Sequence, residues 1–210
     1  QLSASNTELN YPLFFHPIPE DHEQVLYEDE KISICNVILH HTIKCSGFIF
    51  REKKSKRKII KEKIEGYNIP FDKYNGIKEG ADWISNSGEI IKNNKITVES
   101  SPAHSYAFCT DTIYNEALIE KIKEIDLLYH EATFKKDSAV RAKQTGHSTT
   151  YEAASIAKNS SVKNLLIGHF SQRYKNVDEL LIEAKDTFKN TYLAESGLVL
   201  DFNKLNKRID

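Results

Sequence analysis

Short apolar runs alternate with helix-like segments through the second half of the sequence, and this alternation is the feature that most limits the fold. Three runs have the length and content of buried strands, namely residues 104–110, 126–130 and 163–168. Helical spacing follows the first run over 115–125, and Thr149 with Glu152 forms a capping box before a helix over 151–158. The alternation predicts an α/β fold in which helices pack on a sheet.

Further strands are expected on both sides of this region. Residues 31–39 (KISICNVIL) and 45–51 (CSGFIFR) are β-branched and aromatic runs separated by a short polar turn, which predicts a hairpin-like pair. Asn176 with Glu179 indicates the start of another helix. Two short strands are expected near the C-terminus, at 191–196 and 197–202.

The stretch from about residue 52 to 95 has a different character. A lysine-dense run is followed by YNIPFDKYNGIKEG, which carries Pro, Gly and Tyr with little periodicity. We interpret this stretch as an inserted arm. Because lysines bury little surface and the centre of the segment has no apolar stripe, we expect the arm to be flexible and poorly packed.

Composition limits the compartment and the partners. The chain has 29 Lys plus Arg against 30 Asp plus Glu, so any contact with nucleic acid should be local. The three cysteines have no CxxC spacing and are expected to be free thiols in a reducing compartment. No apolar stretch reaches the roughly 20 residues of a membrane helix. We therefore expect a cytoplasmic protein without a membrane partner.

Polar residues at strand ends are the candidates for chemistry, because strand ends in layered α/β folds project side chains into one cleft. The candidates are His41, Asp111, His130 and His169, joined by His147 from a loop before a helix. Imidazole and carboxylate together suit zinc, and two ions roughly 3.5–4 Å apart can clamp a phosphodiester. Taken singly, each histidine has a plainer interpretation as a structural residue, and Asp111 as a helix N-cap.

Four motifs in fixed order carry a family resemblance. CTDT (109–112), HEATF (130–134), GHST (146–149) and GHFSQRY (168–174) closely resemble the ribonuclease Z family of the metallo-β-lactamase superfamily. LHHTIKCSGFIFREK (39–53) is similar to the strand pair that carries an earlier metal-binding histidine in that family. The resemblance covers nearly the whole chain. It implies an αββα sandwich, of which residues 1–210 form a partial domain with a tRNA-binding arm at about 52–95.

The resemblance also implies a role for each candidate. His41 and His169 would each bind one of two metal ions, and Asp111 would bridge the ions. His147 would help to protonate the leaving group or stabilise the scissile phosphate, and Glu131 would act with it by orienting its ring. His130 would lie behind the ligands.

The implied activity is removal of the 3′ trailer from precursor tRNA by zinc-dependent hydrolysis, in a homodimer with two zinc ions per subunit. Basic residues expected to contact the substrate are Lys53, Lys54, Lys56, Arg57, Lys58 and Arg173. The lysine run has a plainer interpretation as a solvated helix face. Arg173 suits a phosphate and a core carboxylate equally well.

The family's principal zinc motif, His-x-His-x-Asp-His, does not occur in this sequence. In family members it lies upstream of the region matched here. We therefore expect this chain to be the C-terminal portion of the enzyme and to be inactive alone. Two rival hypotheses remain open, namely another phosphodiesterase of the same fold and an inactive remnant that binds RNA or dimerises.

Overall fold

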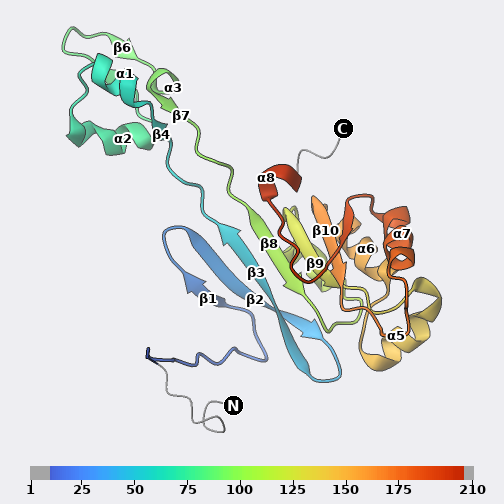
Figure 1. Cartoon of the computed structure of the whole chain (residues 1–210). Coiled ribbons are helices and arrows are strands. Elements are labelled where there is room, and N and C mark those ends of the chain that lie inside the picture. Colours follow the sequence, from blue (N-terminus) through green and yellow to red (C-terminus); the bar gives the residue numbers. More distant parts are fainter. Residues whose placement is uncertain (1–9, 206–210) are drawn as a thin grey trace.

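The computed structural model describes residues 10–205, and its main element is a seven-stranded sheet with the order β1-β2-β3-β8-β9-β10-β11 (Figure 1). The strands are β1 Val25–Glu28, β2 Ile32–His40, β3 Lys44–Glu52, β8 Ser105–Cys109, β9 Leu127–Glu131, β10 Asn164–Gly168 and β11 Thr191–Leu193. Pairing is antiparallel from β1 to β8 and parallel from β8 to β11. The predicted hairpin and the three central strands are confirmed to within about a residue.

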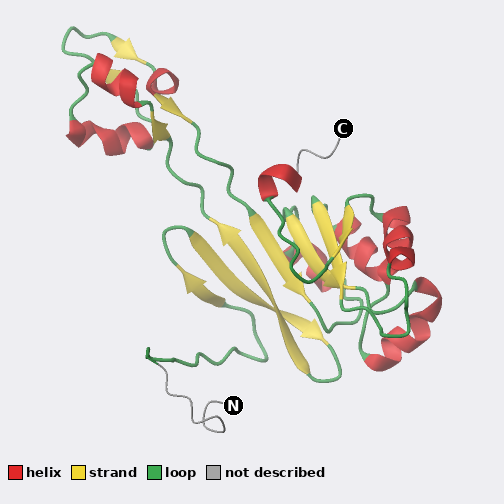
Figure 2. Cartoon of the chain, in the orientation of Figure 1, coloured by secondary structure: helices red, strands yellow, loops and turns green. Residues whose placement is uncertain are grey.

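Helices cover one face of the parallel half of the sheet, as Figure 2 shows. They are α4 Ala117–Lys121, α6 Thr150–Asn159 and α7 Asp178–Thr187, while α5 Ala139–Thr145 lies near the carboxyl ends of the strands. The main core joins Leu128, Leu165 and Ile167 of the sheet to Ala154 and Ile156 of α6. Within the described part of the chain, no helix is both long and apolar enough to cross a membrane.

The predicted capping box of α6 is present, since the Thr149 side chain accepts from the Glu152 amide and Glu152 accepts from the Thr149 amide.

Asp126 connects the parallel strands at their amino ends. Its carboxylate accepts from the amide of Ser105 at 2.7 Å and from Lys163 Nζ at 2.6 Å. These two contacts fasten the amino ends of β8, β9 and β10.

The C-terminal segment differs from the prediction. Residues 191–193 form the expected strand β11, but 197–202 do not form a strand. A turn and an extended loop lead instead into the short helix α8, Phe202–Leu205. The prediction is wrong because Leu200 and Phe202 pack on Tyr106 and Leu166, across the sheet face opposite the helices, rather than pairing along a strand.

The arm projects away from the sheet between β3 and β8 (Figure 1). It contains β4 Lys58–Ile59, α1 Lys61–Gly66, the 3-10 turn η1 Phe71–Lys73, α2 Tyr74–Lys78, β5 Trp83–Ile84, β6 Ile90–Ile91, α3 Asn93–Ile96 and β7 Thr97–Val98. The expectation of poor packing is wrong, because five buried isoleucines form a separate core: Ile64, Ile69, Ile77, Ile91 and Ile96. The buried Asn93 amide donates to the Ile77 and Ala81 carbonyls, both at 2.7 Å. The elements are too short for this core to leave a periodic pattern in the sequence.

Candidate metal centre

The carboxyl ends of the three parallel strands bring distant residues together. Cys109 of β8 and Ile167 of β10 both align with His130 of β9, so the residues that follow them emerge at one edge of the sheet. Asp111, Glu131, His147 and His169 form a group whose candidate ligand atoms all lie within 4.8 Å of one another. Asp111 Oδ1 lies 3.4 Å from His169 Nε2. The edge predicted to carry chemistry therefore gathers four of the named residues.

Two residues at this edge have a backbone conformation that is unusual for residues other than glycine. Asp111 has a φ of 56° and His169 a φ of 60°, both in the left-handed region. The sharp change of direction follows directly after β8 and β10. Strained conformations of this kind concentrate at functional sites, where the surrounding structure holds them in place.

Glu131 is the anchor of the site. It is fully buried, and its carboxylate accepts from the Thr112 amide at 2.5 Å, the Thr133 hydroxyl at 2.5 Å and the Ser148 amide at 3.1 Å. His147 Nδ1 donates to the same carboxylate at 3.0 Å. Because four donors occupy its oxygens, Glu131 is suited to orienting its neighbours rather than to binding a metal.

Three histidines at the edge use the same nitrogen, Nδ1, for a hydrogen bond within the protein. His41 Nδ1 donates to the Gly146 carbonyl at 2.8 Å, and His147 Nδ1 donates to Glu131. His169 Nδ1 donates at 3.0 Å to the Thr133 hydroxyl, which itself donates to Glu131. Each hydrogen bond places the ring proton on Nδ1. Nε2 is then the nitrogen of each ring that can bind a metal ion or take up a further proton.

His41 lies beside this group and not within it. Its ring centroid is 4.8 Å from that of His147. A Cβ at Gly146 would lie 2.6 Å from His41 Nδ1, and Gly146 has a φ of 79°. Only glycine at this position allows the histidine to approach the α5 terminus so closely.

His130 lies away from the cleft. It is fully buried, and its Nδ1 donates to the Glu131 carbonyl at 2.7 Å. Burial holds the pKa of His130 below its usual value, so the ring is neutral. Its Nε2 has no hydrogen-bond partner in the described part of the chain. The contacts are those of a core histidine behind the strand end.

Five of the six predicted basic residues lie at 53–58, where the chain leaves β3 and enters the arm, and the sixth, Arg173, follows β10. Lys53 pairs with Glu28 at 2.8 Å, Lys56 pairs with Glu79 at 2.7 Å, and Arg57 pairs with Glu99. Lys54 and Lys58 are exposed and have no ion pair among residues 10–205. Arg173 is exposed, with its guanidinium 5.0 Å from the Phe134 ring centroid.

Sequence reasoning missed two supporting residues, Thr133 and Ser148. Thr133 links Glu131 to His169, and the Ser148 amide donates to Glu131 while its hydroxyl donates to the Thr112 carbonyl at 2.6 Å. Both lie inside the HEATF and GHST motifs. Their small hydroxyl side chains beside a predicted catalytic residue are the signal that could have identified them.

The solved structures that resemble this chain have the metallo-β-lactamase fold. No family model matches the chain. Among solved structures, the metallo-β-lactamase fold protein YhfI from Bacillus subtilis matches with a TM-score of 0.56 at 18% identity, covering 88% of this chain and 54% of that one. The short form of human tRNase Z matches with a TM-score of 0.51 at 22% identity, covering 86% and 47%.

Curated relatives narrow the class. The chain is 43% identical over 195 residues to ribonuclease Z of Bacteroides thetaiotaomicron, covering 93% of this chain and 62% of the relative. It is 41% identical over 197 residues to ribonuclease Z of Phocaeicola vulgatus, covering 94% and 64%. The chain is therefore a homologue of the ribonuclease Z proteins, and it spans somewhat less than two thirds of their length.

Proposed function

We propose that the chain carries part of the active site of a zinc-dependent endoribonuclease that removes the 3′ trailer from precursor tRNA. The observation that supports this most strongly is the grouping of Asp111, His147 and His169 at one edge of the sheet, with Nδ1 of both histidines held by a hydrogen bond. The similarity to ribonuclease Z is the reason for proposing precursor tRNA as the substrate.

The donor set suits zinc in type and spacing. Imidazole nitrogens and carboxylate oxygens bind zinc at about 2.0–2.2 Å, so ligand atoms on one ion lie a few ångströms apart. Asp111 Oδ1 and His169 Nε2, at 3.4 Å, meet this condition. In this proposal His169, His41 and Asp111 would be the residues of this chain that hold the metal ions. When bound, the ions supply Lewis acidity to the phosphate oxygens.

His147 is the residue that we assign to the leaving group. Its Nδ1–H is fixed on the buried Glu131 carboxylate, which leaves Nε2 as the nitrogen that can exchange a proton with the substrate. A proton at Nε2 can then pass to the departing 3′ oxygen of the ribose as the phosphorus–oxygen bond breaks. Glu131 holds the orientation of the ring.

The leaving-group assignment can be tested with two substrates in a protein that also carries the upstream His-x-His-x-Asp-His segment, because the 210-residue chain alone is expected to be inactive. His147→Ala should lower the rate of precursor tRNA cleavage by about 100-fold or more, because a ribose oxygen needs a proton to depart. Hydrolysis of bis-p-nitrophenyl phosphate should fall much less, since nitrophenolate departs as an anion. His22→Ala is the matched control, because His22 is exposed and contacts Asp21. Equal losses on both substrates would contradict the assignment.

The same measurements separate the rival functions. Hydrolysis of the small diester with no cleavage of precursor tRNA would indicate another phosphodiesterase. RNA binding without any hydrolysis would indicate an inactive remnant. Mapping the product ends of the tRNA reaction tests the 3′-trailer assignment, because cleavage elsewhere in the RNA would contradict it.

We also propose that the arm holds the tRNA and that the protein works as a homodimer. The arm supports the first proposal by projecting as a separately packed body with exposed apolar side chains such as Phe71. In the full-length enzyme, replacing the arm by a short turn should abolish tRNA cleavage and spare hydrolysis of bis-p-nitrophenyl phosphate. Loss of both activities would mean that the arm supports the fold. Sedimentation of the protein, with a monomer as the contrary result, tests the homodimer.

A further inference from the structure

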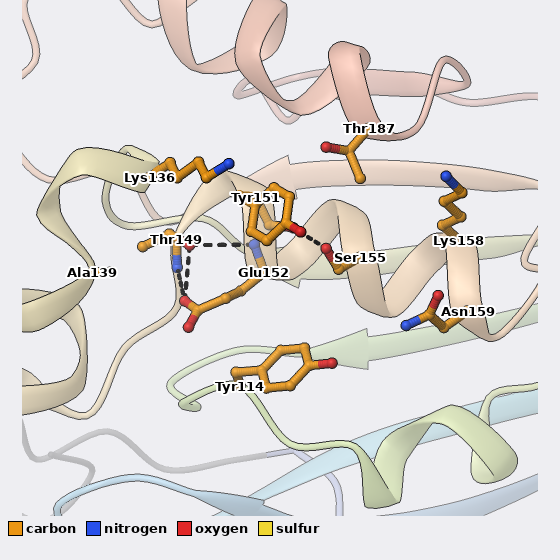
Figure 3. Close-up of a pocket in the computed structure, with 10 residues that line it drawn as sticks. All are labelled: Tyr114, Lys136, Ala139, Thr149, Tyr151, Glu152, Ser155, Lys158, Asn159 and Thr187. Atoms are coloured by element: carbon orange, nitrogen blue, oxygen red, sulfur yellow. Dashed lines mark hydrogen bonds between the residues drawn. The ribbon is translucent and has the colours of Figure 1, made fainter.

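A groove begins at His147 and runs along α6. Its first part has a volume of about 250 Å³ and is lined by His147, Tyr114, Lys143, Glu152 and Ile113. A second hollow of about 640 Å³ continues from it, because Tyr114 and Glu152 also line that one. We call the two hollows together the α6 groove. The lining residues that matter for its binding properties are Tyr114, Lys136, Lys143, His147, Tyr151 and Lys158 (Figure 3).

The charge of the groove is positive. Lys136, Lys143 and Lys158 are exposed, and within residues 10–205 none of them has a carboxylate within ion-pair distance. The acidic lining residue is Glu152, and its Oε2 accepts from the Thr149 amide and hydroxyl, both at 2.8 Å. Since this carboxylate is turned onto the start of α6, the three ammonium groups are available to an anionic ligand.

Aromatic surface lies between these charges. The Tyr151 side chain is 42% exposed, and Lys136 Nζ lies 4.2 Å from its ring centroid. Tyr114 is half-buried and lines both parts of the groove. Figure 3 shows both rings among the lining side chains, with Lys158 further along the helix. Lysines interleaved with aromatic side chains are the composition of surfaces that bind single-stranded nucleic acid.

We propose that the α6 groove binds the unpaired RNA strand adjacent to the scissile phosphate, with phosphates on the three lysines and bases stacked on Tyr114 and Tyr151. This inference rests on the proposed function, because it places the cut beside His147. The ten residues of α6 extend about 15 Å. The groove is therefore longer than one phosphate needs and follows the strand away from the site. Paired RNA is not a candidate, because its base faces are stacked within the helix and cannot reach the tyrosines.

Fluorescence anisotropy with 5′-fluorescein-labelled hexaadenylate tests the groove directly. Tyr114→Ala with Tyr151→Ala should weaken binding by roughly tenfold or more, since each stacked base contributes measurably. Tyr114→Phe with Tyr151→Phe should retain binding, because the rings remain. Tyr27→Ala is the control, as Tyr27 is 51% exposed on β1 at the far edge of the sheet.

The lysines are tested by salt dependence. Changing Lys136, Lys143 and Lys158 to Gln should reduce the slope of log K against log salt by about 2, because each neutralised phosphate of a single strand accounts for about 0.7 of that slope. Lys31→Gln is the control, because Lys31 is exposed beside β2. Affinity within twofold of wild type in both the alanine and glutamine variants would overturn the proposal. So would an equal weakening in the controls, or equally strong competition by polyglutamate, which would indicate an acidic protein partner.

The two hypotheses fail in different ways. Binding of hexaadenylate in the groove, with no cleavage of precursor tRNA by a protein that also carries the upstream His-x-His-x-Asp-His segment, would contradict the proposed function alone. Cleavage with an unchanged KM in the groove variants would contradict the groove alone. Circular dichroism of each variant verifies folding, and the phenylalanine pair keeps the stacking claim falsifiable if an alanine variant fails to fold.

Discussion

At the scale of single residues, the left-handed conformation of Asp111 allows two effects of this residue to be measured separately, namely its effect on stability through the backbone and its effect on zinc binding through the carboxylate. Asn tolerates a φ of 56° about as well as Asp, whereas Ala at such a position costs roughly 1–2 kcal/mol. Asp111→Asn should therefore leave the free energy of unfolding within about 0.5 kcal/mol of wild type and weaken zinc binding at least tenfold. Asp111→Ala should lower both the free energy of unfolding and the affinity for zinc.

Urea unfolding and zinc titration of the two variants provide the comparison. Asn and Ala remove the same carboxylate charge, so any difference in unfolding free energy between them reports the backbone conformation. Undiminished zinc affinity in Asp111→Asn would exclude this carboxylate as a ligand. Equal stability of the two variants would mean that the conformation stores no strain.

At the scale of elements, Asp126 is the link that holds the amino ends of three strands. Burial alone would raise the pKa of its carboxyl, but the contacts with Lys163 and Ser105 outweigh burial and hold the pKa below its ordinary value of 3.8. A depressed folded-state pKa stabilises the fold above the unfolded-state pKa, and this stabilisation is lost as the pH falls through the folded-state value. Asp126→Asn should cost about 1–2 kcal/mol at pH 7.

The pH profile is the critical measurement for Asp126. The difference in unfolding free energy between wild type and Asp126→Asn should shrink as the pH falls below about 4. Asp186→Asn is the control, because Asp186 is exposed on α7. A difference that stays constant from pH 7 to pH 3 would show that the substitution acts through packing and not through charge.

The core of the arm leads to a prediction about independent unfolding. Ile96 is fully buried, and Ile96→Ala should cost about 2–5 kcal/mol, all of it within the arm. Hydrogen exchange should therefore accelerate over residues 58–98 and remain unchanged in β8, β9 and β10. Ile167→Ala, in the main core, should produce the opposite pattern. Faster exchange in the sheet of the Ile96 variant would mean that the two cores unfold together.

The elements differ in how far the sequence could predict them. The strands from β8 to β10 are short apolar runs between turn residues, and the α6 capping box is a local pattern, so both could be located without tertiary information. The core of the arm could not, since Ile64, Ile77 and Ile96 lie on separate short elements without a common period. The strand-end positions of Asp111 and His169 were predictable, but their left-handed φ values arise from tertiary constraint.

At the scale of the whole molecule, the described residues limit how tightly zinc can bind. Once Glu131 is occupied by its donors, Asp111, His147 and His169 remain in the close group, with His41 beside it. Well-formed zinc sites contribute about 10–16 kcal/mol, and a dissociation constant of 1 µM corresponds to about 8 kcal/mol. The 210-residue chain should therefore bind zinc with a dissociation constant above about 1 µM and should not cleave tRNA.

Isothermal titration of the chain with zinc measures this affinity. His169→Ala should abolish the binding signal, whereas His104→Ala should preserve it, because His104 stacks on Phe202 away from the strand-end site. Nanomolar binding or tRNA cleavage by the chain would contradict the prediction. That result would require His40, His130 or His147 as an additional ligand in this chain.

The two ends of the arm meet where it joins the sheet. The Glu52 amide donates to the His104 carbonyl at 2.8 Å, and the His104 amide donates to the Glu52 carboxylate at 2.9 Å. Each doubling of the length of a flexible loop closed at such a point costs only about 0.6 kcal/mol. In evolutionary terms, a genetic insertion or deletion at this junction can exchange one arm for another and leave the strand-end site unchanged.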